Sequence, residues 1–335
     1  MGKGDGIYLV TGGTGFLAGW IIKKLLERGC AVRTTVRSKA KTEVVRSMLA
    51  SEGVGASGLE FAVADLGSPD GWDAAMDGVR AVIHTASPLG GEDHEDPSLI
   101  PVAKSGVQHV LGAAIRQGVP RFVMTSSTAA NYPDKSCTDP AVNEEFWTDP
   151  ENRWITNYMR SKLFAERLAW QMAAESDIEL VTILPGAILG PSLGGRRSST
   201  DQICEMLLKG MPIPRAVYPV VDVRDLAELH ILAADKPEAA GQRFIAQSEE
   251  MTMPEMADVL RKRYPKRKVS RLVIPDAIVG FAARFSTPMK VLNTMVDLSY
   301  HRDGSKARRV LGWEPRPAAE TVVDTAECLI SMGIA

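Results

Sequence analysis

The fold is decided by residues 7–19, which read IYLVTGGTGFLAG. The apolar run at 7–10 predicts a buried strand, and a helix is predicted over residues 18–28, directly after the glycines. Glycines permit a tight turn and a close approach to a pyrophosphate, and a helix N-terminus offers unpaired N–H groups and the positive end of the helix dipole. This strand, turn and helix therefore predict a dinucleotide site. The alternative is a glycine-rich turn that binds no ligand.

Short apolar runs alternate with longer amphipathic runs from this motif as far as about Pro185. Strands that alternate with helices along a chain pair in parallel through right-handed crossovers. The fold class that we predict is therefore α/β, with a doubly wound parallel sheet of the Rossmann type. Further strands are predicted over residues 31–36, 59–63, 81–85, 121–124 and 179–184, and further helices over residues 42–51, 97–117 and 158–174.

The pattern changes after Pro185, where residues 186–199 are rich in Gly, Pro, Ser and Arg and predict a loop. We expect a smaller C-terminal substrate-binding lobe over the carboxyl edge of the sheet, where doubly wound proteins bind ligands. The loops at 89–96 and 186–199 are candidates for a lid, with disorder as an equal alternative. The expected domains are a dinucleotide-binding domain over residues 1–185, to which 221–247 returns, and a substrate-binding lobe over 186–220 and 248–335.

The composition indicates an ordinary globular protein. The chain has 335 residues, of which 45% are hydrophobic and 24% are charged, and a net charge of −2 gives no electrostatic reason to expect nucleic acid or an anionic membrane as partner. Four scattered cysteines predict free thiols in a reducing compartment, and five scattered histidines give no metal-ligand spacing. No apolar run approaches the roughly 18 residues of a membrane span. We therefore expect a cytoplasmic protein with no bound metal.

The second predicted strand is followed by basic residues. An acidic residue at its end would accept from the ribose of NAD, but the chain has Arg37, with Lys41 close behind. A guanidinium offers a planar, charge-assisted fork to a 2′-phosphate, which favours NADPH about ten- to a hundred-fold. The alternative for Arg37 is a surface arginine. After the third predicted strand, Asp65 suits a carboxylate that accepts from the adenine amino group.

Tyr158 and Lys162 have the i, i+4 spacing that places two side chains on one helix face. A tyrosine phenol has a pKa of about 10, and a nearby ammonium favours the phenolate and lowers that pKa. This pair therefore indicates proton transfer. Ser126 and Ser127 follow the strand predicted over 121–124, where a hydroxyl can hydrogen-bond a substrate carbonyl. Ordinary turn chemistry at a strand end is the alternative and explains at least one of the two serines.

Together these motifs resemble the extended short-chain dehydrogenase/reductase family, and within it the branch of dihydroflavonol-reductase-like and cinnamoyl-CoA-reductase-like carbonyl reductases. The resemblance extends over nearly the whole chain. The segments that carry it are 11–19, 35–37, 65–66, 84–88, 123–127, 158–162, 184–191, 221–227, 303–307 and 311–315. In this family the segment 221–227 looks structural rather than catalytic.

The resemblance implies a catalytic triad. Ser127 would orient and polarise the carbonyl, Tyr158 would donate the proton, and Lys162 would hold the nicotinamide ribose and lower the pKa of Tyr158. The implied substrate contacts are Ser87, Pro88 and Tyr132. The cofactor residues that it implies, together with those argued above, are Gly12, Thr14, Gly15, Phe16, Leu17, Arg37, Lys41, Asp65, Leu66, Thr85, Ala86, Ser87, Tyr158, Lys162 and Pro185.

The function that we expect is reversible, NADPH-dependent reduction of a small aldehyde or ketone to an alcohol, by a monomer or homodimer. Tyr132 stands where plant flavonoid reductases carry an asparagine, which favours a generic carbonyl reductase over a dihydroflavonol reductase. One alternative is an NAD-dependent sugar-nucleotide epimerase or dehydratase, which would hold NAD tightly and prefer an acidic residue in place of Arg37. The other is a non-enzymatic NADP-binding regulator, which would need neither Tyr158 nor Lys162.

Overall fold

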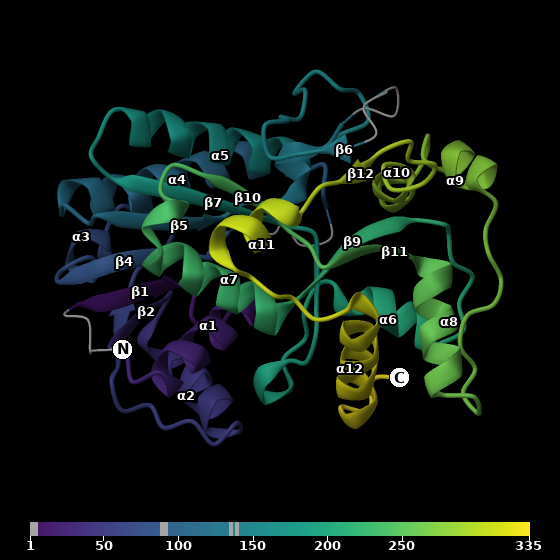
Figure 1. The fold of residues 1–335 in the computed structure, drawn as a ribbon, viewed down its shortest axis with the longest axis horizontal. Helices are drawn as coiled ribbons and strands as arrows, with labels where there is room; N and C mark the ends of the chain where they lie inside the picture. The colour runs from purple at the N-terminus through teal and green to yellow at the C-terminus, as the bar shows by residue number, and fades with distance from the viewer. Residues whose placement is uncertain (1–5, 88–92, 134–136, 138–140) are drawn as a thin grey trace.

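The centre of the molecule is a seven-stranded parallel sheet with the strand order β10-β7-β5-β4-β1-β2-β3 (Figure 1). A computed structural model describes residues 6–87, 93–133, 137 and 141–335. The order reverses between β1 and β4, so the doubly wound Rossmann-type fold is confirmed. The strands are β1 (Ile7–Thr11), β2 (Val32–Val36), β3 (Leu59–Val63), β4 (Val79–His84), β5 (Arg121–Thr125), β7 (Glu179–Pro185) and β10 (Arg243–Ala246).

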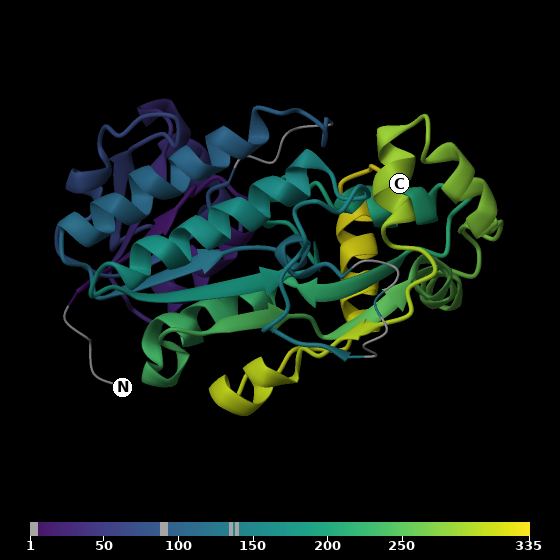
Figure 2. The ribbon, with the colours of Figure 1, turned by 90° about the horizontal axis from the view of Figure 1, so that it is seen from above.

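Helices cover both faces of this sheet (Figure 2). One face packs against α1 (Phe16–Glu27), α2 (Thr42–Ala50) and α7 (Val223–Asp235), and the other against α3 (Trp72–Ala75), α4 (Leu99–Arg116) and α5 (Asn157–Ala174). Successive side chains of a strand point to opposite faces. Tyr8 and Val10 of β1 accordingly join the first hydrophobic cluster, while Leu9 joins the second. Both faces of β1 are therefore buried, as expected for the centre of a parallel sheet.

One prediction about the chain after Pro185 is wrong. The predicted loop at 186–199 contains a strand, β8 (Ala187–Leu189), which pairs in parallel with β9 (Val217–Asp222). Gly186 lies against the neighbouring strand, since a Cβ at this position would be 2.0 Å from the carbonyl oxygen of Pro219. The glycine is thus required by close strand approach, although its sequence context predicted a turn.

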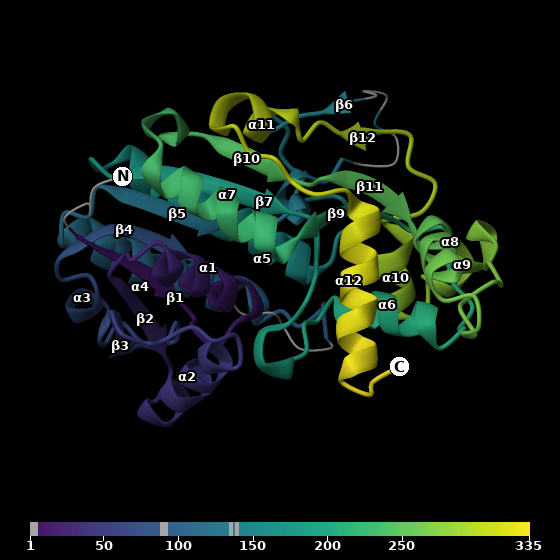
Figure 3. The ribbon, with the colours of Figure 1, turned by 60° about the horizontal axis from the view of Figure 1, so that its bottom comes forward.

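The chain after β8 builds a third hydrophobic cluster beside the large sheet (Figure 3). A three-stranded sheet of β8, β9 and β11 (Glu249–Thr252) packs there with α6 (Asp201–Leu208), α8 (Met253–Arg263) and α12 (Ala318–Ser331). The remaining elements are α9 (Asp276–Ala282), α10 (Thr287–Asn293), α11 (Ser305–Leu311) and a two-stranded sheet of β6 (Ala141–Val142) and β12 (His301–Arg302). The domain boundaries proposed from the sequence stay a prediction.

The four cysteines are free thiols. Within the described ranges, no helix is long and apolar enough to cross a membrane. Among the same residues, no group of three or more His, Cys, Asp or Glu side chains is arranged to hold a metal ion.

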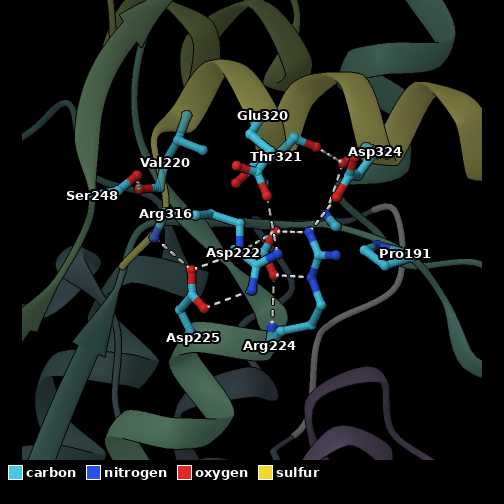
Figure 4. Close-up of polar contacts among 12 residues, drawn as sticks. Pro191, Val220, Asp222, Arg224, Asp225, Ser248, Arg316, Glu320, Thr321 and Asp324 are labelled. Atoms are coloured by element: carbon cyan, nitrogen blue, oxygen red, sulfur yellow. Dashed lines mark hydrogen bonds and ion pairs between the residues drawn. The ribbon is translucent and has the colours of Figure 1, made fainter. Parts of the chain in front are cut away.

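A buried carboxylate at the end of β9 is paired with arginines from α7 and from the segment before α12 (Figure 4). Asp222, which ends β9, is 0% exposed and caps α7 by accepting from the backbone N–H of Arg224 at 2.8 Å. It also accepts from the guanidinium of Arg224 at 2.7 and 2.8 Å and lies 3.5 Å from Nε of Arg316. Arg224 reaches Asp324 on α12 as well. The segment that follows β9 therefore makes structural contacts, in agreement with its expected role.

We expect Asp222→Ala to lower the free energy of unfolding by about 3–5 kcal/mol, because two guanidiniums lose a buried carboxylate. Urea denaturation measures this loss. The control is Glu320→Gln, which removes an exposed partner 3.3 Å from the same Arg316. This control should cost less than about 1 kcal/mol. Equal losses in the two variants would contradict the structural role of Asp222.

Candidate active site

The N-terminus of α1 has the properties of an anion site. Its N-cap residue, Gly15, has no side chain to cap the helix, and the first turn contains no acidic residue. The first N–H groups of a helix have no partner within the helix. Gly12 has a φ of 73°, and a Cβ there would lie 3.1 Å from that of Ala86. The loop thus lies against the end of β4 and leaves the N–H groups of Phe16 and Leu17 for a pyrophosphate, so the residues fit a dinucleotide.

Thr11 fixes this loop to the segment after β4. Its Oγ1 accepts from the backbone N–H groups of Thr85 and Ala86, both at 3.1 Å, and lies 2.9 Å from Nδ1 of His84. Burial lowers the pKa of His84 to about 3, with a smaller contribution from the charge of Lys162. The imidazole is therefore neutral and acts as a structural hydrogen-bonding group. Two of the expected cofactor residues, Thr85 and Ala86, are thereby held beside the glycine loop.

The segment after β2 presents unpaired positive charge. Arg37 and Lys41 are exposed, and neither side chain has a hydrogen bond or ion pair with any residue in the described part of the chain. Asp65, which follows the next strand, β3, is also exposed and accepts from the N–H of Gly67 at 2.8 Å. Because parallel strands end at the same edge of a sheet, these residues share the edge that carries the glycine loop. This arrangement suits the adenosine end of a dinucleotide with a 2′-phosphate.

The three residues of the expected triad lie together at the same edge. Ser127 begins the short helix η2 (Thr128–Asn131), where its Oγ accepts from the N–H of Ala129 at 3.1 Å. Its side chain lies close enough to the phenol of Tyr158 to lower the pKa of that phenol. Lys162 is 7% exposed, and its Nζ lies 5.8 Å from the centre of the Tyr158 ring and donates to Oγ of Ser87 at 2.8 Å. A serine hydroxyl, a phenol and an ammonium therefore converge from β5 and α5.

Burial sets the protonation of this group. It raises the pKa of Tyr158, and the nearby hydroxyl of Ser127 offsets part of this rise. Burial also lowers the pKa of Lys162 to about 8. At neutral pH the phenol is thus protonated and can donate, and the lysine is largely charged. The lowering of the Tyr158 pKa by Lys162 stays a prediction.

A buried ion pair places α5 against the sheet. Glu166, one turn after Lys162, is 0% exposed and accepts from Nε of Arg243 at 2.8 Å. It also accepts from the hydroxyls of Ser126 at 2.6 Å and Thr182 at 2.7 Å. These contacts join α5 to β5, β7 and β10. They fix the helix that carries Tyr158 and Lys162 relative to Ser127.

A cavity of about 210 Å³ opens beside Ser127 and Tyr158. Most of its lining is apolar or aromatic and comes from distant parts of the chain, including Ile203, Val217, Met295 and Leu298. Apolar cavities with a few convergent polar groups are the usual form of small-molecule sites. Ser127 and Tyr158 therefore line a pocket of the size of a small organic molecule.

The structure places the expected substrate residues unequally. Tyr132 lines the cavity, Ser87 contacts Lys162, and Pro88 lies outside the described residues. Leu66 lies with its carbonyl oxygen 2.8 Å from Nδ1 of His109, and Pro185 is buried at the end of β7.

Sequence reasoning missed two groups of residues. Glu166 and Arg243 form one such group, and because they lie 77 residues apart no local sequence pattern predicts that they pair. The cavity wall over residues 291–302 lies far along the chain from Ser127. The only signal for the wall is the resemblance of the neighbouring segment 303–307, which says nothing about a pocket.

The chain matches a known protein family and is similar to several proteins that are named as reductases. Residues 8–246 match the model of the NAD dependent epimerase/dehydratase family. The chain is 35% identical over 268 residues to tetraketide alpha-pyrone reductase 2 of Arabidopsis thaliana, which covers 77% of this chain and 83% of that protein. It is 35% identical over 263 residues to cinnamoyl-CoA reductase 1 of Oryza sativa subsp. japonica, with 77% and 75% covered. The structure of the yeast methylglyoxal/isovaleraldehyde reductase complexed with NADPH superposes with a TM-score of 0.81 at 26% identity and covers 98% of this chain and 100% of that one.

The lowered pKa of Lys162 predicts a pH-dependent stability. Between about pH 8 and its ordinary value of 10.5 the unfolded chain holds a proton on this lysine that the folded chain has lost, so stability rises with pH in that window. We expect Lys162→Met to be more stable than the parent at pH 7 by about 1–3 kcal/mol, with the difference falling towards zero near pH 10.

Urea denaturation of nucleotide-stripped protein across this pH range measures the difference. Lys104→Met, at an exposed position of α4, is the control and should change stability at pH 7 by no more than about 0.5 kcal/mol. A parent that is more stable than Lys162→Met at pH 7, or a difference that does not vary with pH, would show that burial of this ammonium is not costly.

Proposed function

Because the chain belongs to the NAD dependent epimerase/dehydratase family and has reductases among its relatives, we propose that it is an NADPH-dependent reductase of aldehydes or ketones. The observation that carries the proposal is that Ser127 and Tyr158 both line one largely apolar cavity. Two hydroxyls at the wall of one cavity can both donate to one carbonyl oxygen. This is the arrangement that a carbonyl reduction needs.

The nucleotide-binding residues support NADPH as the cofactor. In this proposal the free N–H groups at the N-terminus of α1 donate to the pyrophosphate, and Arg37 and Lys41 donate to the 2′-phosphate. The yeast reductase that superposes on the chain is complexed with NADPH. NADPH supplies a hydride to the carbonyl carbon. An acidic residue in place of Arg37 would instead favour NAD, as the epimerase alternative requires.

Tyr158 is the proton donor in this proposal. As the carbonyl oxygen gains negative charge, the phenol transfers its proton to that oxygen and the product becomes an alcohol. A proton donor must hold its proton at working pH, and burial raises the pKa of Tyr158 in the required direction. The reverse reaction begins with the phenolate, which the ammonium of Lys162 stabilises.

Ser127 and Lys162 prepare the reaction. The hydroxyl of Ser127 donates to the carbonyl oxygen and holds it within reach of Tyr158. The ammonium of Lys162 binds the ribose hydroxyls of the cofactor, for which it exchanges its present contact with Ser87. The apolar cavity wall excludes water, which strengthens both electrostatic contacts.

The substrate class, a free aldehyde or ketone and not a thioester, is also part of the proposal. Cinnamoyl-CoA reductase 1 has a thioester in its name, and the chain shares 35% identity with it. Cinnamoyl-CoA-reductase-like sequences carry an N-W-Y-C motif before the catalytic lysine. This chain has Asn157-Tyr158-Met159 at the start of α5 instead, and this difference favours a free aldehyde or ketone as substrate. Assays of NADPH oxidation with ketones, aldehydes and a cinnamoyl thioester separate the two classes.

We expect Tyr158→Phe to lower kcat by about 10²–10⁴, because it removes the proton donor and keeps the ring. The affinity for NADPH, measured by fluorescence titration, should change less than about three-fold, since the phenol hydroxyl is not a nucleotide phosphate ligand. Near-normal turnover by folded Tyr158→Phe protein would exclude this residue as the acid.

We expect Arg37→Ala to reduce the preference for NADPH over NADH by about ten- to a hundred-fold, through loss of charge-assisted hydrogen bonds to the 2′-phosphate. The ratio of kcat/KM for the two cofactors measures the preference. The control is Arg116→Ala: this exposed arginine pairs with Asp73 at the C-terminal end of α4, on the opposite edge of the sheet. The assignment fails if the two variants keep the same preference.

A further inference from the structure

The substrate cavity has a second polar group besides the triad. Tyr300 and Arg302 both line it, and they are 6% and 8% exposed. The hydroxyl of Tyr300 and Nε of Arg302 are buried and have no hydrogen-bond partner in the part of the chain that the structure describes. Buried donors without a partner are rare, because each costs about 1–3 kcal/mol. Two of them at the wall of one cavity point to a ligand that supplies an acceptor.

The position of Arg302 is fixed by its backbone. Arg302 is in β12, where it pairs with Val142 of β6, and its carbonyl oxygen accepts from Nε2 of Gln247 at 2.6 Å. Gln247 follows β10 directly, and Figure 3 shows β12 beside the carboxyl end of that strand. The sheet order places β10 two strands from β5, and Ser127 lies two residues after the end of β5. Two strand spacings amount to roughly 10 Å, so Arg302 lies at a distance from the reacting carbonyl.

The charge of Arg302 is only weakly compensated. Its Nη1 lies 3.8 Å from Oε1 of Glu250, a long ion pair that leaves Nε unpaired. The guanidinium of Arg302 also lies 5.4 Å from the centre of the Tyr300 ring. Burial raises the pKa of Tyr300, although the charge of Arg302 and its closeness to the phenol lower that pKa in part, so the phenol keeps its proton. Both residues line the cavity, and both side chains carry hydrogen-bond donors. An oxygen acceptor, and above all a carboxylate, satisfies both.

We propose that Arg302 and Tyr300 form a specificity site that binds a carboxylate or ester oxygen of the substrate, distal to the carbonyl that Tyr158 and Ser127 reduce. This inference rests on the proposed reductase function and adds the substrate class. The preferred substrates are small, otherwise apolar carbonyl compounds that carry a second oxygen acceptor about two strand spacings away. The apolar lining between the two polar groups binds the carbon chain that joins them.

The test compares 8-oxooctanoate, its methyl ester and octanal, which share one aldehyde and differ at the far end. The parent should have a KM for octanal that is about ten- to a hundred-fold above that for the acid or the ester, with similar kcat. Arg302→Gln and Tyr300→Phe should remove that difference and leave the KM for octanal within about two-fold. A preference for the acid alone identifies a carboxylate, and equal use of acid and ester identifies a neutral acceptor; both support the site.

The control is Tyr264→Phe, because the hydroxyl of Tyr264 is also buried without a partner but does not line the cavity. It should preserve the difference between the acid and octanal. Tyr300→Phe keeps the ring and removes only the hydroxyl, so its KM values test the site even if Arg302→Gln fails to fold. A parent without any preference between octanal and the other two, or variants that lose all three substrates equally, would overturn the inference.

A binding measurement separates this inference from the proposed function. The parent should bind 8-hydroxyoctanoate more tightly than 1-octanol by calorimetry, and Tyr300→Phe should lose that difference. If no carbonyl is reduced and the hydroxy acid still binds through Tyr300, the proposed reductase function is wrong and the acceptor site stands. If carbonyls are reduced without discrimination, the acceptor site is wrong and the reductase function stands.

Discussion

The buried ion pair between Glu166 and Arg243 is the contact on which the geometry of the site depends. A fully buried carboxylate is costly unless it is paired and hydrogen-bonded, and Glu166 obtains its partners from three strands of the sheet. One of them, Ser126, immediately precedes Ser127, while Glu166 itself lies one turn from Lys162. The same contacts that satisfy the carboxylate therefore set the separation between the serine hydroxyl and the phenol of Tyr158.

The first half of the fold follows from local patterns. Every strand predicted before Pro185 is present within two residues of its expected start, because a strand buried on both faces is a continuous apolar run bounded by turns. Residues 186–199 do not follow their local pattern, since Gly186 is required by the close approach of a neighbouring strand and not by a turn. After residue 200, α7 and β10 return to the large sheet, whereas α6, α8 and α12 pack with the small sheet, so the arrangement depends on tertiary contacts that no periodicity records.

The residues of the candidate site also fall into two groups, those that local sequence patterns predict and those that only tertiary contacts bring together. Tyr158 and Lys162 are predictable because one helical turn brings them together, and the glycine loop because its residues are contiguous. Arg302 and Tyr300 reach the cavity through a two-residue strand pair and a hydrogen bond to Gln247, which are tertiary contacts between distant segments. The family resemblance predicted Ser127, whereas no sequence pattern predicted the cavity wall, which is built from segments far apart in the chain.

The pairing of Glu166 has a consequence for the order of biosynthesis. The carboxylate leaves the ribosome 77 residues before the guanidinium that compensates it. Until β10 joins the edge of the sheet, docking α5 would bury an uncompensated charge, at a cost of about 3–5 kcal/mol. We therefore expect the docking of α5 in a nascent chain to be completed only after residue 243 has emerged. A fragment that ends near residue 185 contains the whole nucleotide loop but lacks Arg243, whose charge compensates Glu166 when α5 packs against the sheet.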